Sequence, residues 1–66
     1  MNLITETKTK INDIDLYIKD LQECLEQPVS EDCRKYLANK LIKATKGLEY
    51  YSEVLKVLEK VKERES

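Results

Sequence analysis

Histidine, tryptophan and phenylalanine are absent from the sequence, and glycine and proline each occur once among its 66 residues. Without histidine or a glycine-rich loop, the usual general bases and phosphate-binding turns of enzymes are missing. The two cysteines, with no histidine to complete the set, are too few for a tetrahedral zinc site. We therefore predict a protein that is not an enzyme and that binds no cofactor, metal ion or small molecule.

Long apolar runs are also missing. The longest is the three-residue stretch Leu16–Ile18, and charged residues at positions 6, 8 and 10 occupy the region where a secretory signal would be apolar. The sequence thus predicts no membrane-spanning segment and a cytoplasmic location. In that compartment the two cysteines are expected to remain thiols.

Charged residues make up 38 % of the chain, and lysine, glutamate and leucine are abundant. This composition is typical of long helices and coiled coils. Sixty-six residues form one domain at most, near the lower size limit for a chain that folds alone. We expect a single all-α domain over residues 1–66, with a core so thin that self-association would stabilise it.

A long helix is predicted over residues 31–64. Its apolar residues alternate spacings of four and three, the heptad pattern that buries one stripe of a helix against another helix. We call this stripe the inner seam. It consists of Leu37, Leu41, Ala44, Leu48, Tyr51, Leu55 and Leu58.

A shorter helix is predicted over residues 3–26 by the same alternation of spacings. Asn2, Thr5 and Thr7 are each suitable to cap its N-terminus, and the pattern leaves the choice among them open. The apolar stripe of this helix consists of Ile4, Thr7, Ile11, Ile14, Ile18, Leu21 and Leu25.

A turn at residues 27–30 separates the two helices. Pro28 disfavours helical geometry at the preceding residue and has no N–H to donate, so the first helix ends there. Ser30, followed by two acidic residues, is a typical helix start. A turn this short returns the chain as an antiparallel helical hairpin, in which we expect Ile14 to lie near residues 43–44.

Gly47 leaves two architectures open. Glycine costs about 1 kcal/mol relative to alanine within a helix, so the second helix could end there and a third could begin, closing a monomeric bundle. However, the inner seam passes Gly47 without a change of phase, and the following Leu48 is no capping residue. We therefore favour one continuous helix in which Gly47 lets a neighbouring backbone approach closely.

Cys24 and Cys33 fall opposite each other beside the turn in this register. Two interpretations remain for the pair. They are either small apolar side chains that pack where the helices converge, or partners of a disulfide that forms under oxidising conditions. Either role would stabilise the hairpin near its turn.

The apolar surface of the second helix widens toward its C-terminal end. Lys40 and Lys43 interrupt the flank of the inner seam, whereas apolar residues flank it from Leu48 to Val61. A wide apolar arc can contact more than one helix, so we predict that two hairpins associate into a homodimeric four-helix bundle. The residues predicted to form this self-association or partner interface are Tyr50, Tyr51, Val54, Leu55, Val57, Leu58 and Val61.

Charge is distributed unevenly. Residues 1–27 contain three lysines and six acidic residues, whereas residues 28–48 contain five basic and two acidic residues. The simplest interpretation is complementarity between the helices of one hairpin or of two subunits, since the net charge of −1 gives no general attraction to nucleic acid.

These features favour a small regulatory module that binds another protein by helix–helix packing. One alternative is a monomeric inhibitor that occupies a groove on a larger protein. Another is an RNA-binding hairpin dimer, because in overall plan the chain is similar to small plasmid-encoded RNA-binding hairpin dimers, although it shares no motif with them. The residues that would contact nucleic acid are Arg34, Lys35, Lys40, Lys43 and Lys46.

Overall fold

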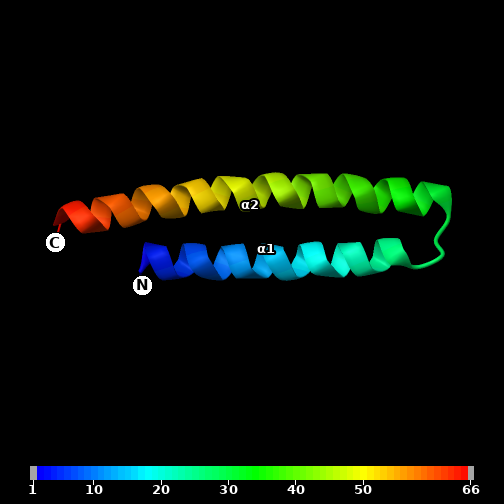
Figure 1. The fold of residues 1–66 in the computed structure, drawn as a ribbon, viewed down its shortest axis with the longest axis horizontal. Helices are drawn as coiled ribbons and strands as arrows, with labels where there is room; N and C mark the ends of the chain where they lie inside the picture. Colours follow the sequence, from blue (N-terminus) through cyan, green and yellow to red (C-terminus); the bar gives the residue numbers. More distant parts are fainter. Residues whose placement is uncertain (1, 66) are drawn as a thin grey trace.

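A computed structural model describes residues 2–65, with side chains described for residues 2–62. It contains two helices, α1 (Leu3–Glu26) and α2 (Glu31–Glu65). They lie side by side and antiparallel, and α2 extends past the start of α1 (Figure 1). The predicted all-helical hairpin is thereby confirmed, with helix boundaries within one residue of those expected from the sequence.

The N-terminus of α1 is capped by Asn2. Its side-chain oxygen accepts a hydrogen bond from the backbone N–H of Ile4 at 2.8 Å, which identifies the cap among the three candidates. Thr7 has a different role, because its hydroxyl donates to the carbonyl oxygen of Leu3 at 2.7 Å. This bond satisfies a hydroxyl that is buried in the seam between the helices.

Pro28 ends α1 as the sequence predicts. The preceding Gln27 has φ −78° and ψ 156°, the extended geometry favoured before proline. Its N–H donates to the carbonyl oxygen of Cys24 at 3.1 Å. The next helix begins at its cap, where the hydroxyl oxygen of Ser30 accepts the N–H of Cys33 at 3.2 Å.

Arg34 connects the two helices beside the turn. One of its terminal nitrogens, Nη1, donates to the carbonyl oxygen of Leu25 at 3.2 Å. The last carbonyls of a helix are unsatisfied and carry partial negative charge, and the last turn of α1 contains no basic residue. Arg34 of α2 therefore supplies the cation that α1 lacks.

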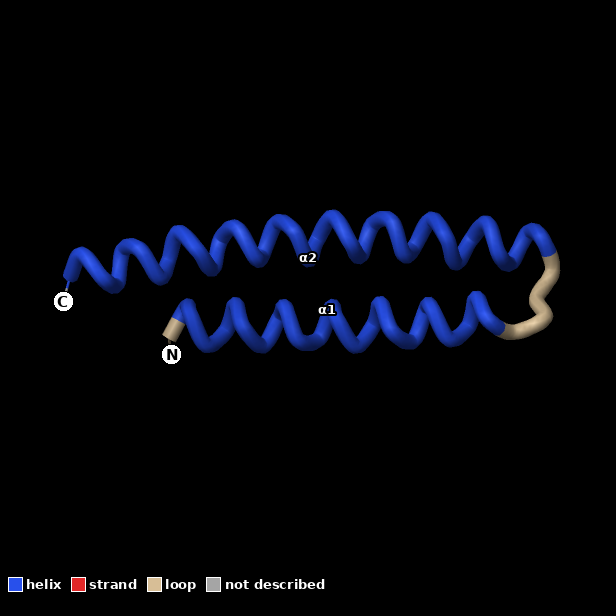
Figure 2. The backbone as a smooth tube through the Cα atoms, in the orientation of Figure 1, coloured by secondary structure: helices blue, strands red, loops and turns tan. Residues whose placement is uncertain are grey.

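α2 continues as one helix through Gly47 (Figure 2). The three-helix alternative is therefore wrong, because the inner seam keeps its phase on both sides of the glycine. A Cβ atom at this position would lie 3.8 Å from Cδ1 of Ile14, which is an ordinary van der Waals distance. Packing within the hairpin thus leaves room for a methyl group at position 47.

Replacing Gly47 by alanine is expected to raise the free energy of unfolding by about 1 kcal/mol, because alanine loses less backbone entropy in a helix. Urea denaturation followed by circular dichroism, at one fixed protein concentration, measures the gain. A valine at the same site is the matched control, and its gain should be smaller because a β-branched side chain is restricted in a helix. A loss of stability on Gly47→Ala would contradict the ordinary van der Waals distance between the added methyl group and Ile14.

The hairpin alone buries little apolar surface. Among the described apolar side chains only Leu21, with 6 % of its surface exposed, is buried, and the other apolar seam residues are half-buried. The molecule measures 53 × 15 × 15 Å and has a solvent-accessible surface of 5475 Å². A compact monomer of this mass would expose about 4,400 Å². The single hairpin therefore keeps roughly 1,100 Å² more surface in water than a compact fold would.

Candidate interaction surface

The seven residues predicted to form an interface lie on two neighbouring stripes of α2. Tyr51, Leu55 and Leu58 belong to the inner seam and are half-buried in the hairpin. The other four lie on the flank of that seam, where the structure leaves three of them exposed and one half-buried. These four are Tyr50, Val54, Val57 and Val61.

The flank is itself a second heptad seam, which we call the outer seam. Its residues also alternate spacings of four and three, so they form one continuous stripe beside the inner seam. The sequence predicted only its C-terminal part, as the flank of a wide apolar arc, because two lysines interrupt the apolar pattern nearer the turn. The regular spacing alone would have extended the stripe through these lysines. The outer seam consists of Tyr36, Lys40, Lys43, Gly47, Tyr50, Val54, Val57 and Val61.

The chemistry of the outer seam changes at Gly47. Toward the turn, the ammonium of Lys40 lies 5.4 Å from the ring centre of Tyr36, a cation–π contact between residues one helical turn apart. Beyond Gly47 the seam is apolar and begins with Tyr50, whose ring lies edge-on to that of Tyr51 with centres 5.2 Å apart. The outer seam thus has a basic half and an apolar half.

Two shallow grooves follow the outer seam. The first has a volume of about 280 Å³ and is lined by Tyr50, Glu53, Val54, Val57 and Leu58. The second has a volume of about 360 Å³ and is lined by Ile14, Tyr17, Lys40, Lys43, Ala44 and Gly47. Because Ile14, Lys43 and Ala44 line this same groove, the predicted proximity of Ile14 to residues 43–44 is confirmed. The groove also places Tyr17 of α1 on the same face of the hairpin as the outer seam.

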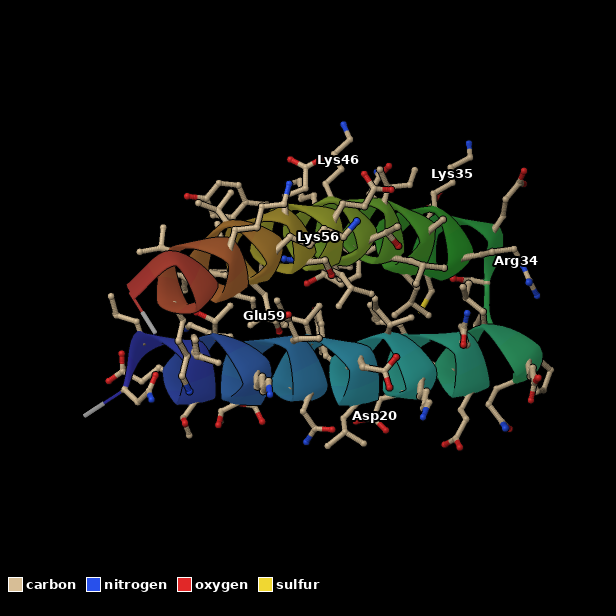
Figure 3. The ribbon with its side chains drawn as sticks, turned by 60° about the vertical axis from the view of Figure 1, so that its left-hand side comes forward. Asp20, Arg34, Lys35, Lys46, Lys56 and Glu59 are labelled. Atoms are coloured by element: carbon tan, nitrogen blue, oxygen red, sulfur yellow. The ribbon has the colours of Figure 1, made fainter. Side chains whose placement is uncertain are left out.

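The five basic residues considered for RNA binding do not form one stripe. Lys35 and Lys46 project from α2 away from α1, whereas Arg34 lies at the turn (Figure 3). Lys40 packs over an aromatic ring and Lys43 lines a groove between the helices. A phosphate backbone following α2 would therefore meet only part of this set at once.

No ion pair joins α1 to α2 among residues 2–62. The ion pair found in that range lies within α1, between the ammonium of Lys19 and the carboxylate of Asp15 at 3.2 Å. The predicted charge complementarity, within one hairpin or between two subunits, therefore involves no direct ion pair between α1 and α2 in that range and stays a prediction.

Cys24 and Cys33 are free thiols near the turn. Cys24 is exposed and Cys33 is half-buried. Both the packing role and the disulfide under oxidising conditions stay predictions.

Over the residues whose side chains are described, no cluster of three or more histidine, cysteine, aspartate or glutamate side chains is arranged to hold a metal ion. Neither helix, over its described length, is apolar enough to cross a membrane. No family model, curated protein or solved structure matches this chain. The outer seam is the most distinctive part of the hairpin surface.

Proposed function

We propose that the protein is a small, non-enzymatic interaction module that acts in the cytoplasm as a homodimer held by helix–helix packing. One observation supports this most strongly: the apolar half of the outer seam is open to solvent. Tyr50, Val57 and Val61 are 63 %, 59 % and 46 % exposed, although they follow one another on a single helical face. Soluble proteins seldom leave such a contiguous apolar stripe uncovered.

The surface area of the hairpin supports the same proposal. A stable protein–protein interface removes about 800 Å² from each partner. The hairpin exposes roughly 1,100 Å² more than a compact monomer of its mass. Covering the outer seam with a second copy would therefore bring the surface of each subunit close to that of an ordinary folded domain. The two hairpins together would supply the four helices of a bundle.

A protein regulated by this module would bind the surfaces of the hairpin that remain exposed in the dimer. Leu16 on α1 and Ile42 on α2 are 51 % and 54 % exposed, and both lie outside the seams. Isolated exposed aliphatic residues are common on soluble proteins, and each of these two offers an apolar contact that a partner can cover. We propose that these outer faces dock a larger protein.

Thermal unfolding over a wide range of protein concentration tests the proposed homodimer. If folding is coupled to association, the melting temperature rises with protein concentration. The experiment uses circular dichroism with a reductant present, so that the exposed thiol of Cys24 forms no intermolecular disulfide. A melting temperature that is independent of concentration would contradict the homodimer and favour the monomeric inhibitor instead.

RNA binding is the second candidate because Lys35 and Lys46 both project from the side of α2 that faces away from α1 (Figure 3). Two copies would present these lysines twice. The test is a titration of a labelled RNA duplex at several salt concentrations, in which binding through phosphates weakens linearly with the logarithm of salt concentration. Loss of that dependence in Lys35→Gln, Lys46→Gln would support this alternative, whereas failure to bind at low salt would exclude it.

A further inference from the structure

We infer that two copies associate tail to tail, with the C-terminal halves of their α2 helices antiparallel and their outer seams in contact. Val54 of one copy then lies against Val57 of the second copy, and Tyr50 lies against Val61. This inference rests on the proposed homodimer and adds its orientation and register. It replaces a four-helix bundle of fully overlapping hairpins with a dimer in which the C-terminal halves of the two α2 helices overlap. Orientation and register are both determined by the pattern of the outer seam and by the charges beside it.

The apolar half of the outer seam has the symmetry that an antiparallel pair requires. Its residues are spaced by four, three and four, a pattern that reads the same in both directions. An antiparallel copy therefore places an apolar residue opposite every apolar residue, in alternating layers of the coiled-coil type. The contact is isologous, because each copy contributes the same patch and the two-fold axis passes between the layers.

A parallel arrangement is disfavoured by the basic half of the same seam. Two parallel helices would continue in register toward the turn and would bring Lys40 against Lys40 and Lys43 against Lys43 of the second copy. Like charges opposed in an interface repel each other, at a cost that increases as water is excluded. In the tail-to-tail dimer these lysines lie beyond the overlap and remain in solvent.

In an antiparallel dimer centred on Gly47, the two outer seams would overlap along the whole hairpin. Lysines of one copy would then face apolar residues of the other. Lys43 would lie opposite Tyr50, and Lys40 would lie opposite Val54. Each lysine would then have to withdraw its ammonium from an apolar layer, since an unpaired buried charge is costly. The tail-to-tail register avoids this by pairing the apolar half of the seam with itself.

Charges on the edge of the apolar half support the tail-to-tail register. Glu53 and Lys60 are both exposed, and they lie seven residues apart on the same flank of the outer seam. Neither takes part in an ion pair among the described side chains of the hairpin. In an antiparallel coiled coil, equivalent flanking positions face each other, so Glu53 of each copy lies beside Lys60 of the other. Two-fold symmetry forms this pair twice.

The end of the hairpin is suitable for such an overlap. α2 extends beyond the start of α1, so its last turns are not covered by its own first helix (Figure 1). Leu3, at the start of α1, is 64 % exposed. A second α2 that runs back along the outer seam would pass this end of α1, and the first turns of both α1 helices would then meet near the two-fold axis.

Disulfide exchange between two cysteine variants tests orientation and register together. In a Cys24→Ala, Cys33→Ala background, Val54→Cys and Val57→Cys proteins are mixed in equal amounts in a glutathione redox buffer. Disulfide geometry is strict, so only cysteines in the same layer form an unstrained bond. The expected result is a mixed disulfide that exceeds each homodisulfide by about tenfold or more.

Each other outcome overturns the inference in a distinguishable way. An excess of both homodisulfides would show a parallel dimer. A statistical mixture from a protein of dimeric mass would show another register. Both of these results leave the proposed homodimer intact, whereas a monomeric mass for the unmodified chain would overturn the homodimer as well.

Small-angle X-ray scattering on the unmodified protein provides a test that does not depend on the cysteine variants. An overlap of about 20 residues of α2 is roughly 30 Å long, so the tail-to-tail dimer should have a maximum dimension of about 75 Å. One hairpin is 53 Å long. A dimeric mass with a maximum dimension close to that of one hairpin would show full-length overlap and would overturn the inference.

Discussion

Replacing Val57 and Val61 together by glutamate is expected to dissociate the homodimer, raising its dissociation constant on the order of 10³-fold or more. Each dimer loses four buried valine side chains, worth roughly 1.5 kcal/mol each, and must also bury or displace four carboxylates. Both valines are largely exposed in the single hairpin, at 59 % and 46 %. The hairpin itself should therefore remain helical by circular dichroism while its mass in sedimentation velocity falls to that of one chain.

The matched control places the same charges on the outer faces of the hairpin. Leu16 and Ile42 are 51 % and 54 % exposed, so a Leu16→Glu, Ile42→Glu protein makes two comparable apolar-to-acidic changes outside the outer seam. Its mass should remain that of the unmodified protein. Equal dissociation of both variants would indicate a general charge effect and would contradict an interface on the outer seam.

Replacing Leu21 by alanine is expected to destabilise the hairpin by about 2–5 kcal/mol. Among the described residues, Leu21 is the most completely buried apolar side chain, with 6 % of its surface exposed. A small domain has a total stability near the lower end of the usual 5–15 kcal/mol range, so this one truncation should leave much of the protein unfolded at room temperature. Helical circular dichroism in a urea titration measures the loss.

Leu16→Ala is the control for this truncation, because it removes the same atoms from the same helix at a site that is 51 % exposed. This substitution should change the free energy of unfolding by less than about 0.5 kcal/mol, as most surface substitutions do. Similar losses at both sites would mean that α1 does not pack against α2 along the seam that contains Leu21.

The path of the backbone could be predicted from sequence because local signals and apolar spacing agree. Pro28 marks the end of α1, Ser30 marks the start of α2, and the unchanged phase of the inner seam predicts a helix that passes through Gly47. The N-terminal cap was the exception. Asn2 and two threonines offer similar chemistry, and only the hydrogen bond to Ile4 distinguishes Asn2 from the others.

The surface was harder to predict because side-chain interactions there are weak and compete with water. The balance of charge between the helices suggested pairing within the hairpin, yet the described ion pair, Asp15–Lys19, lies within α1. Exposed ion pairs contribute little, so charge alone does not fix the packing. Only the apolar half of the outer seam was predicted, because Lys40 and Lys43 occupy two positions of the other half and apolar pattern rules count lysine as an interruption.

Sedimentation equilibrium of the unmodified protein, over a range of concentrations and with a reductant present, tests the central claim most directly. The homodimer predicts a molar mass that approaches twice the 7.8 kDa of one chain as concentration rises. A mass that stays at 7.8 kDa throughout that range would contradict it. The outer seam would then be a surface that a different protein covers.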